Sequence, residues 1–315
     1  MPAPSTWARP ARSRNCCRPP RWRRWPTPAS TALRTSRRRA AGSVLSEGFH
    51  QPPRPPRIFL AGGSSTVTRE VSKAPMTGWG QVLHFFLTPE IEVVNCARAG
   101  ASARTFHERG RLDWILATID PGDYLLICFG INDAKPDEWL HTEAYGDFPV
   151  HLRAFIDGAR ERNAHPVLVS PPERDTHDVH GNLPRSITEY PMAMADVAAE
   201  CSVPYIDLYN RSHQWWAELG PEGVRPFFVN LEPGEHPNYP EGLRDPVHMT
   251  PDGALACARF VAYSLVAEQV VPAHWAVDLD RAHFPPDAVT WLDDATHHEL
   301  TRARTLGTGW EAEPS

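Results

Sequence analysis

Four groups of residues in the chain have the types and the order that acyl-transfer chemistry requires. Ser64 follows a short apolar run and two glycines, a position from which a serine can act as a nucleophile. Asp245 and His248 lie three residues apart, which places them on one face of a helical turn, so the carboxylate can orient the imidazole as a base. Gly100 and Asn132 follow two further apolar runs and offer an N–H group and an amide to an oxyanion. The sequence therefore predicts a Ser64, His248 and Asp245 triad with an oxyanion hole made of Ser64, Gly100 and Asn132.

Each of these residues also has a purely structural interpretation. A lone serine after glycine is usually a turn residue, and Gly100 by itself indicates no more than a tight turn. Asn132 and Asp133 both favour turns and helix caps, and we interpret Asp133 as structural. Among 15 histidines most must be solvated or structural, and a surface Asp-x-x-His pair often caps a helix. The catalytic interpretation depends on the four groups occurring together.

The elements that must position these residues alternate between strands and helices. Strands are predicted at residues 57–61, 92–96, 124–129, 166–170 and 205–208, and their continuous apolar character is typical of parallel strands covered on both faces. Helices are predicted at residues 78–87, 112–118, 148–163, 189–200, 211–219 and 251–268. This alternation predicts an α/β fold, a three-layer α/β/α, flavodoxin-like arrangement with a doubly wound parallel five-stranded sheet. In such sheets ligands bind outside the carboxyl ends of the strands.

Composition divides the chain into three parts. Residues 1–56 are rich in arginine, proline and serine and too poor in apolar residues to fold, so we expect a disordered extension. Of a nucleic-acid-binding arm, a transit-like segment and a stretch translated from a misassigned start, we favour the last. Residues 57–272 are predicted to form the hydrolase domain. Residues 273–315 are predicted to form a partly ordered C-terminal extension.

Charge and cysteine content limit the partners and the compartment. Residues 1–46 hold eleven arginines and no acid, so in a chain of net charge −6 the remainder carries −17, which argues against nucleic acid as a partner. No apolar run approaches the length of about 20 residues that crosses a bilayer, and we expect no membrane partner. The six cysteines show no regular spacing, and no apolar signal core of about 7 to 15 residues is present. We therefore expect a cytoplasmic protein, with secretion left open.

The four groups resemble the motifs of the SGNH (GDSL-type) hydrolase superfamily, with Ser64, Gly100, Asn132 and His248 at its four named positions. Further motifs are similar to the rhamnogalacturonan acetylesterase branch, and the likeness covers about residues 57–267. They are IFLAG before the serine, the stretches at 77–80, 104–106 and 122–124, the strand at 166–170 followed by Arg174, and Tyr190-Pro191. The resemblance implies a flavodoxin-like fold, a metal-free Ser-His-Asp mechanism without cofactors, and deacetylation of an O-acetylated sugar.

Two features depart from the family pattern. The aspartate that precedes the serine in the family is Gly63 here, so a carboxylate that buttresses the loop is missing. We expect reduced preorganisation of the site and not a loss of its chemistry. The second feature is an ambiguity, because aligning residues 63–66 to the motif would make Ser65 the nucleophile. The ungapped alignment through residues 58–62 favours Ser64.

The expected function is a serine esterase that removes O-acetyl groups from a pectic rhamnogalacturonan-type glycan or oligosaccharide. Trp79 is a candidate for stacking on a sugar ring, and Arg104 and Arg174 are candidates for contacting uronic carboxylates. Histidines and aspartates near residues 177–180 and 236–248 have no spacing typical of a metal site, and we expect no metal. Two alternatives stay open: an esterase or lipase acting on another small acyl ester, and a non-catalytic glycan-binding relative, which Gly63 motivates.

Overall fold

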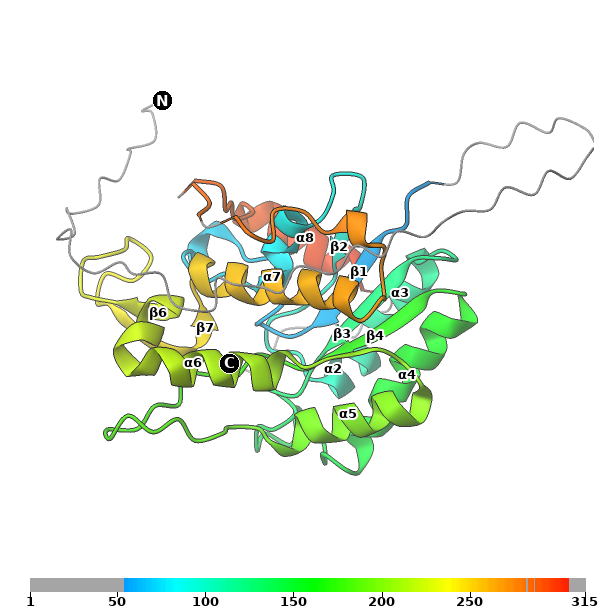
Figure 1. Ribbon diagram of the computed structural model, residues 1–315, viewed down its shortest axis with the longest axis horizontal. Coiled ribbons are helices and arrows are strands. Elements are labelled where there is room, and N and C mark those ends of the chain that lie inside the picture. Colours follow the sequence, from blue (N-terminus) through cyan, green and yellow to red (C-terminus); the bar gives the residue numbers. More distant parts are fainter. Residues whose placement is uncertain (1–53, 282, 286, 306–315) are drawn as a thin grey trace, which may run out of the picture.

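A five-stranded parallel sheet forms the centre of the molecule in a computed structural model that describes residues 54–281, 283–285 and 287–305 (Figure 1). The strand order is β2-β1-β3-β4-β5, the order of flavodoxin-like folds. The strands are β1 (Ile58–Gly62), β2 (Val93–Asn95), β3 (Tyr124–Cys128), β4 (His165–Val169) and β5 (Tyr205–Ile206). Each lies within one or two residues of a predicted strand, and the predicted fold class is confirmed.

Helices cover both faces of the sheet because the strands are apolar on both sides. Along β1, Ile58 and Leu60 face one hydrophobic cluster, whereas Phe59 and Ala61 face the other. The first cluster is formed mainly with α1 (Trp79–Val82), α6 (Leu208–Val224) and α7 (Pro251–Ala267). The second is formed with α2 (Ala103–Glu108), α3 (Arg111–Thr118), α4 (Asp147–Glu161) and α5 (Glu189–Cys201). Figure 1 shows α7 on one side of the strands and α4 and α5 on the other, which gives three layers.

Two predicted helices differ in form from the structure. The segment 78–87 contains only one turn of α-helix, α1, followed by a 3₁₀ turn at Leu83–Phe86. Helix α6 extends beyond both predicted ends but is broken at Gly220, whose positive φ of 65° interrupts the helix before Pro221. Other short 3₁₀ helices lie at Val71–Lys73, Arg225–Phe227 and Ala273–Trp275.

An antiparallel hairpin carries the predicted Asp245 and His248 pair. It consists of β6 (Phe228–Leu231) and β7 (Leu243–Met249) and leads directly into α7. The expectation that this pair lies on a helical turn is therefore wrong. Pro246 lacks an N–H group and interrupts the regular strand, and the pairing of β6 and β7 shifts register there. The contact between the two side chains is made across this irregular part of the strand.

The C-terminal extension folds back onto the segment that follows β1. Helix α8 (Asp294–Ala303) lies in this extension, and Leu292 pairs with residues 69–71 through N–H and carbonyl groups at 2.7 and 3.1 Å. The indole of Trp291 donates to the Met76 carbonyl at 2.8 Å. The described residues that follow Thr290 in this extension are thus packed against the domain. The prediction for residues 306–315, and that for residues 1–53, falls outside the described residues.

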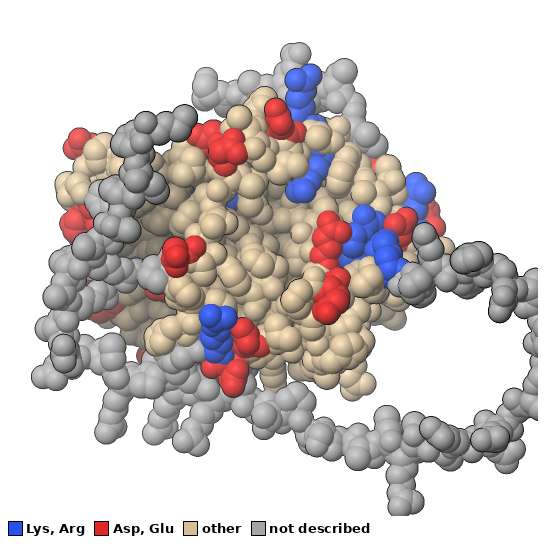
Figure 2. Space-filling view, turned by 90° about the horizontal axis from the view of Figure 1, so that it is seen from above, with Lys and Arg blue, Asp and Glu red and all other residues tan. Residues whose placement is uncertain are grey.

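The surface seen in Figure 2 carries acidic and basic side chains close to one another, with uncharged residues between them. Residues that begin the described chain form such a mixed group, because Arg54 and Arg57 both donate to Asp123 at 2.9 Å. Among the described residues, no helix is both long enough and apolar enough to cross a membrane.

Candidate active site

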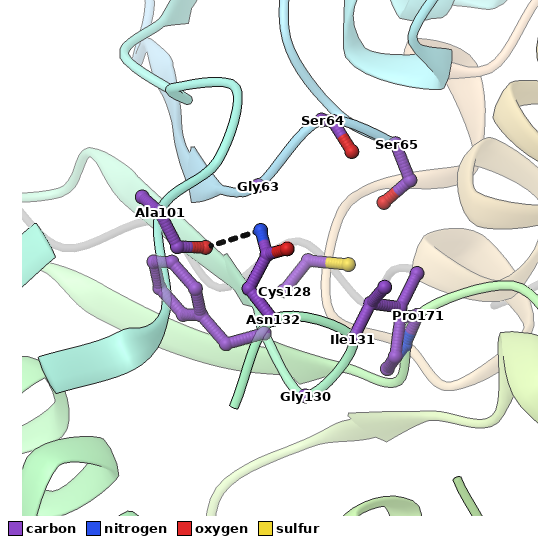
Figure 3. Close-up of a pocket in the computed structure, with 10 residues that line it drawn as sticks. Gly63, Ser64, Ser65, Ala101, Cys128, Gly130, Ile131, Asn132 and Pro171 are labelled. Carbon is purple, nitrogen blue, oxygen red and sulfur yellow. Dashed lines mark hydrogen bonds between the residues drawn. The ribbon is translucent and has the colours of Figure 1, made fainter. Parts of the chain in front are cut away.

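The turn after β1 presents two serines to one cavity. The N–H groups of Thr66 and Val67 both donate to the Gly63 carbonyl, at 3.1 and 3.2 Å, and this closes the turn. Ser64 is half-buried, whereas Ser65 is only 8% exposed. Figure 3 shows both hydroxyl groups directed into the same space. The geometry therefore keeps both serines as candidates for the nucleophile.

The cavity opens to solvent, and its empty space, with the open solvent at its mouth included, is about 220 Å³. Its walls come from the loops that follow β1, β2, β3 and β4, as expected at the carboxyl edge of a parallel sheet. The residues that line it are Gly63, Ser64, Ser65, Ala101, Cys128, Phe129, Gly130, Ile131, Asn132 and Pro171. Apart from the two serines and Asn132, this lining is apolar or backbone. Such a space suits a small acyl group beside a hydroxyl nucleophile.

Asn132 lies on the floor of the cavity with its amide group fixed. Its Nδ2 donates to the Ala101 carbonyl at 3.0 Å, and the residue is 5% exposed (Figure 3). Because an amide nitrogen has two hydrogens, this bond leaves the second one for a ligand. A Cβ atom built on Gly63 would lie 3.3 Å from the Ala101 oxygen and 3.4 Å from Asn132 Nδ2. Because Gly63 has no side chain, the Ala101 carbonyl and the Asn132 amide can pack against the turn that carries Ser64.

Asp133 supports the same region from beneath. Its carboxylate is fully buried and accepts from the N–H groups of Ala103 and Gly130, both at 2.9 Å, and from the Thr142 hydroxyl at 3.2 Å. It therefore joins the loop after β2 to the loop after β3. Burial raises the pKa of Asp133 to about 6, although these hydrogen bonds favour its charged form. Asp133 thus has a structural role, as the sequence suggested, and Gly130, one of its partners, lines the cavity.

Gly100 lies beside the cavity and not in its wall. Its φ of +79° is the left-handed conformation that favours glycine, and Ala101, the next residue, contributes to the lining. Within the described part of the chain, the N–H groups of Gly100 and Ser64 have no hydrogen-bond acceptor. Two donors are thus left unused close to the Asn132 amide.

Asp245 and His248 form a tight pair. Asp245 Oδ2 lies 2.6 Å from His248 Nδ1, and Oδ1 accepts from the N–H groups of Val247 and His248, both at 2.9 Å. Burial by itself raises the pKa of Asp245, but the hydrogen bond and charge of His248 outweigh it and hold that pKa below its usual value. An ionised carboxylate can only accept, so Nδ1 carries a proton, and in the neutral imidazole the lone pair is then on Nε2. This is the form in which a histidine acts as a base.

The serine turn and the histidine strand are joined through one short segment. Trp79 donates its N–H to the Ser65 carbonyl at 2.8 Å, and Thr77 donates its N–H to the Met249 carbonyl at 2.9 Å. No hydrogen bond between Ser64 and His248 occurs within the described residues. The structure therefore gathers Ser64 and Asn132 around one cavity and pairs Asp245 with His248, without a direct bond between the two halves. Catalytic hydrogen bonds are often long before substrate binds.

The three residues proposed for substrate contact differ in their burial and in their partners within the protein. Trp79 is fully buried beneath the sheet, so its expected role in sugar stacking is wrong. Arg104 donates to the Glu138 carbonyl and lies 3.9 Å from the Asp147 carboxylate, so it is already engaged within the protein. Arg174 is half-buried, and its side chain has no hydrogen-bond partner or ion pair among the described residues. Of the two arginines, only Arg174 has its whole guanidinium without a hydrogen-bond or ion-pair partner among the described residues.

The amino-acid pattern of the GDSL-like Lipase/Acylhydrolase family matches residues 60–256. The chain belongs to this family. It is 42% identical over 209 residues to "Rhamnogalacturonan acetylesterase RhgT" of Bacillus subtilis (strain 168), an overlap of 66% of this chain and 89% of the relative. It is 38% identical over 208 residues to "Probable rhamnogalacturonan acetylesterase YesY" of the same organism, an overlap of 65% and 90%.

A solved structure shows the same fold. The crystal structure of protein YxiM from Bacillus subtilis superposes with a TM-score of 0.57 at 28% sequence identity, over 70% of this chain and 58% of that one. The chain thus spans little more than half the length of that protein. Together with the family match, this confirms the predicted SGNH-type family and the predicted enzyme class, a carboxylic ester hydrolase.

Among the described residues, no group of three or more histidine, cysteine or acidic side chains is close enough together to hold a metal ion.

Proposed function

We propose that this protein is a serine esterase that removes O-acetyl groups from an acidic, rhamnogalacturonan-type carbohydrate. The observation that carries the proposal is the cavity that Ser64 and the fixed Asn132 amide both line. The paired Asp245 and His248 belong to a strand that residues 77–79 join to the serine turn. The relatives RhgT and YesY, named as rhamnogalacturonan acetylesterases, support the substrate class. The small apolar walls of the cavity favour an acetyl group over a long acyl chain.

The proposed reaction begins with His248 removing the proton of the Ser64 hydroxyl as its oxygen attacks the acetyl carbonyl. The carbonyl π electrons move onto the oxygen, and the N–H groups of Ser64 and Gly100 and the amide of Asn132 stabilise the resulting oxyanion. When the tetrahedral intermediate collapses, the bond to the sugar oxygen breaks and His248 returns the proton to it. Asp245 keeps the imidazole in the required tautomer throughout. The products of this half-reaction are the free sugar hydroxyl and an acetyl ester on Ser64.

Water completes the cycle by the same steps. His248 takes a proton from the water, whose oxygen attacks the acetyl-enzyme, and then gives that proton to Ser64 as acetate leaves. Arg174 is proposed to contact a uronic carboxylate outside the reacting centre, because its guanidinium is free for a ligand and Pro171, three residues earlier, lines the cavity.

The decisive test measures acetate release from 4-nitrophenyl acetate and from acetylated rhamnogalacturonan oligosaccharides by the wild type and the variants Ser64→Ala and Ser65→Ala. We expect Ser64→Ala to lose nearly all turnover on both substrates and Ser65→Ala to retain most of it. Loss in Ser65→Ala alone would move the nucleophile by one residue and leave the esterase proposal standing. A folded wild type that releases no acetate from either substrate would refute the proposal.

We further propose that the enzyme works in a reducing compartment on imported oligosaccharides, in line with the expected cytoplasmic location. The support is that Cys96, Cys128, Cys201 and Cys257 are all free thiols in the structure. Fractionation of cells that express the full chain, with mass spectrometry of its N-terminus, tests this. Recovery of a shortened protein from the medium would show export instead.

A further inference from the structure

Arg69 is a buried arginine beside the nucleophile turn. It lies five residues after Ser64, is 6% exposed, and its Nη2 makes a long contact of 3.5 Å to the Ser64 carbonyl. Neither the catalytic steps above nor the sequence motifs assign it a role. Its position next to the reacting serine therefore needs a physical explanation.

The guanidinium of Arg69 has more donors than the protein satisfies. Its Nε is sealed from solvent and has no hydrogen-bond partner. Nη1 also has no protein partner, but it is not sealed from solvent. No carboxylate lies within 4.0 Å of the group in the described part of the chain. Burial lowers the pKa of Arg69, which is the mark of a cation that its surroundings do not fully compensate.

The anionic groups nearest to Arg69 are already engaged. Asp245, which attracts it electrostatically, is paired with His248, and Glu70 is paired with His297 at 3.4 Å. The Tyr239 hydroxyl is the third group that favours its charge, whereas Arg98 opposes it. Burying a charge without a counter-ion costs free energy, and this cost falls when a ligand supplies the counter-ion.

The backbone of Arg69 is fixed on both sides. Its N–H donates to Gln81 Oε1 at 3.0 Å, and its carbonyl accepts from the N–H of Leu292 at 3.1 Å. Gln81 in turn donates to the Thr290 carbonyl at 2.7 Å. The side chain therefore starts from a rigid frame, which is the arrangement expected of a preorganised binding group.

We propose that Arg69 binds a carboxylate that the reaction brings to the edge of the catalytic cavity. The inference rests on the proposed function and deepens it, because a uronic-acid unit carries a carboxylate on the same ring as the hydroxyls that can be acetylated. A second source has the same chemistry, since hydrolysis releases acetate next to Ser64. In both cases the carboxylate meets the free Nη1 and gives the guanidinium the anion that the protein does not provide.

The test compares the wild type with Arg69→Gln and Arg69→Lys on three substrates: an acetylated galacturonate oligosaccharide, its methyl ester and 4-nitrophenyl acetate. Loss of a hydrogen-bonded ion pair predicts a fall in kcat/KM of about 10- to 100-fold on the acidic oligosaccharide. We expect changes below about 3-fold on the two uncharged substrates, and partial retention in Arg69→Lys, which keeps the charge but not the planar fork. Arg259→Gln is the matched control, because Arg259 is 7% exposed but lies in α7 and donates to the Arg281 carbonyl.

Acetate inhibition separates the two sources. If the carboxylate belongs to the product, the inhibition constant of acetate rises about 10-fold in Arg69→Gln while the preference for the acidic oligosaccharide stays as in the wild type. An equal fall on all three substrates would overturn the proposal, because it would mean that Arg69 only positions Ser64. Unchanged substrate preference together with unchanged acetate inhibition would overturn it as well.

A binding measurement tests the role of Arg69 independently of the proposed esterase activity. Calorimetric titration of deacetylated oligogalacturonate into Ser64→Ala, with and without Arg69→Gln, measures carboxylate binding without turnover. If the wild type hydrolyses nothing, the proposed function fails, yet a 10-fold weaker binding in the double variant would still support the role of Arg69. Thermal melts of all variants show which are folded, and Arg69→Lys carries the test if Arg69→Gln is not.

Discussion

Replacing Asp133 by asparagine tests how a buried carboxylate supports the loops around the cavity. In the native structure this carboxylate accepts three hydrogen bonds, from Ala103, Gly130 and Thr142. An asparagine keeps one oxygen acceptor but turns an NH₂ group toward one of the remaining donors. We expect kcat to fall, since Gly130 lines the cavity and Ala103 follows the Gly100 loop.

The effect of this change on stability depends on pH in a definite direction. The pKa of Asp133 is raised from 3.8 in the unfolded chain to about 6 in the folded protein. The stability that it contributes is therefore fully present below pH 3.8 and is lost as the pH rises through about 6. Two pH units at 1.36 kcal/mol each give a loss on the order of 3 kcal/mol. Asparagine does not ionise. As the pH rises, the free energy of unfolding of the variant therefore increases by this amount relative to that of the wild type.

Urea denaturation of both proteins at pH 4, 5, 6 and 7.5 measures this difference. Subtracting the two free energies of unfolding at each pH cancels the titration of all other groups. We expect the stability of Asp133→Asn relative to the wild type to increase by about 2 kcal/mol between pH 4 and pH 7.5, because part of the total change has already occurred at pH 4. A difference that stays constant, or that moves against the variant as the pH rises, would refute the argument that burial dominates the pKa of this carboxylate.

Three further changes give distinct outcomes. Asn132→Ala removes one oxyanion donor and should lower kcat by about 100- to 1000-fold with little change in Tm; an unaltered kcat would exclude Asn132 from the oxyanion hole. Gly63→Val should lower kcat by roughly 10- to 100-fold, because its Cβ would lie 3.3 Å from the Ala101 oxygen and its branches would displace the Asn132 amide. Full activity in that variant would show that the amide tolerates a neighbour. Arg54→Ala removes a donor to Asp123, whose pKa burial would raise but the arginine hydrogen bonds hold at about 2. Without Arg54 the pKa of Asp123 should rise, so the stabilisation by its carboxylate should disappear at a higher pH as the solution is acidified. The midpoint of acid unfolding should therefore shift upward. At neutral pH the free energy of unfolding should fall by about 1 kcal/mol or less.

The sequence predicted the elements whose signals are local. The strand at Ile58–Gly62 and the helix at Pro251–Ala267 were recognisable because an unbroken apolar run and a proline at the first helical position are readable within a few residues. The pairing of Asp245 with His248 was also predicted correctly, since three residues of chain hold the two side chains close in several conformations. The conformation itself was wrong, because Pro246 sits in a strand whose partner lies about 15 residues earlier.

Features that depend on distant contacts were not predictable in the same way. Nothing near Trp79 in the sequence distinguishes a buried indole from one exposed to a sugar, and only its packing against α7 and the sheet decides this. Arg69 likewise reads as an ordinary charged residue, because one of the contacts that fix its backbone comes from a segment more than 200 residues later. The C-terminal extension looked irregular because its helix and its contacts gain stability from the domain beneath them.

The pairing of Leu292 with residues 69–71 has a consequence for the synthesis of the enzyme on the ribosome. A ribosome makes the turn with Ser64 more than 200 residues before Leu292, which supports the backbone of Arg69 and Val71. Since domains begin to fold while the chain is still growing, the sheet can assemble before this support exists. The growing chain can thus form its sheet before the backbone of Arg69 and Val71 has its partner on Leu292.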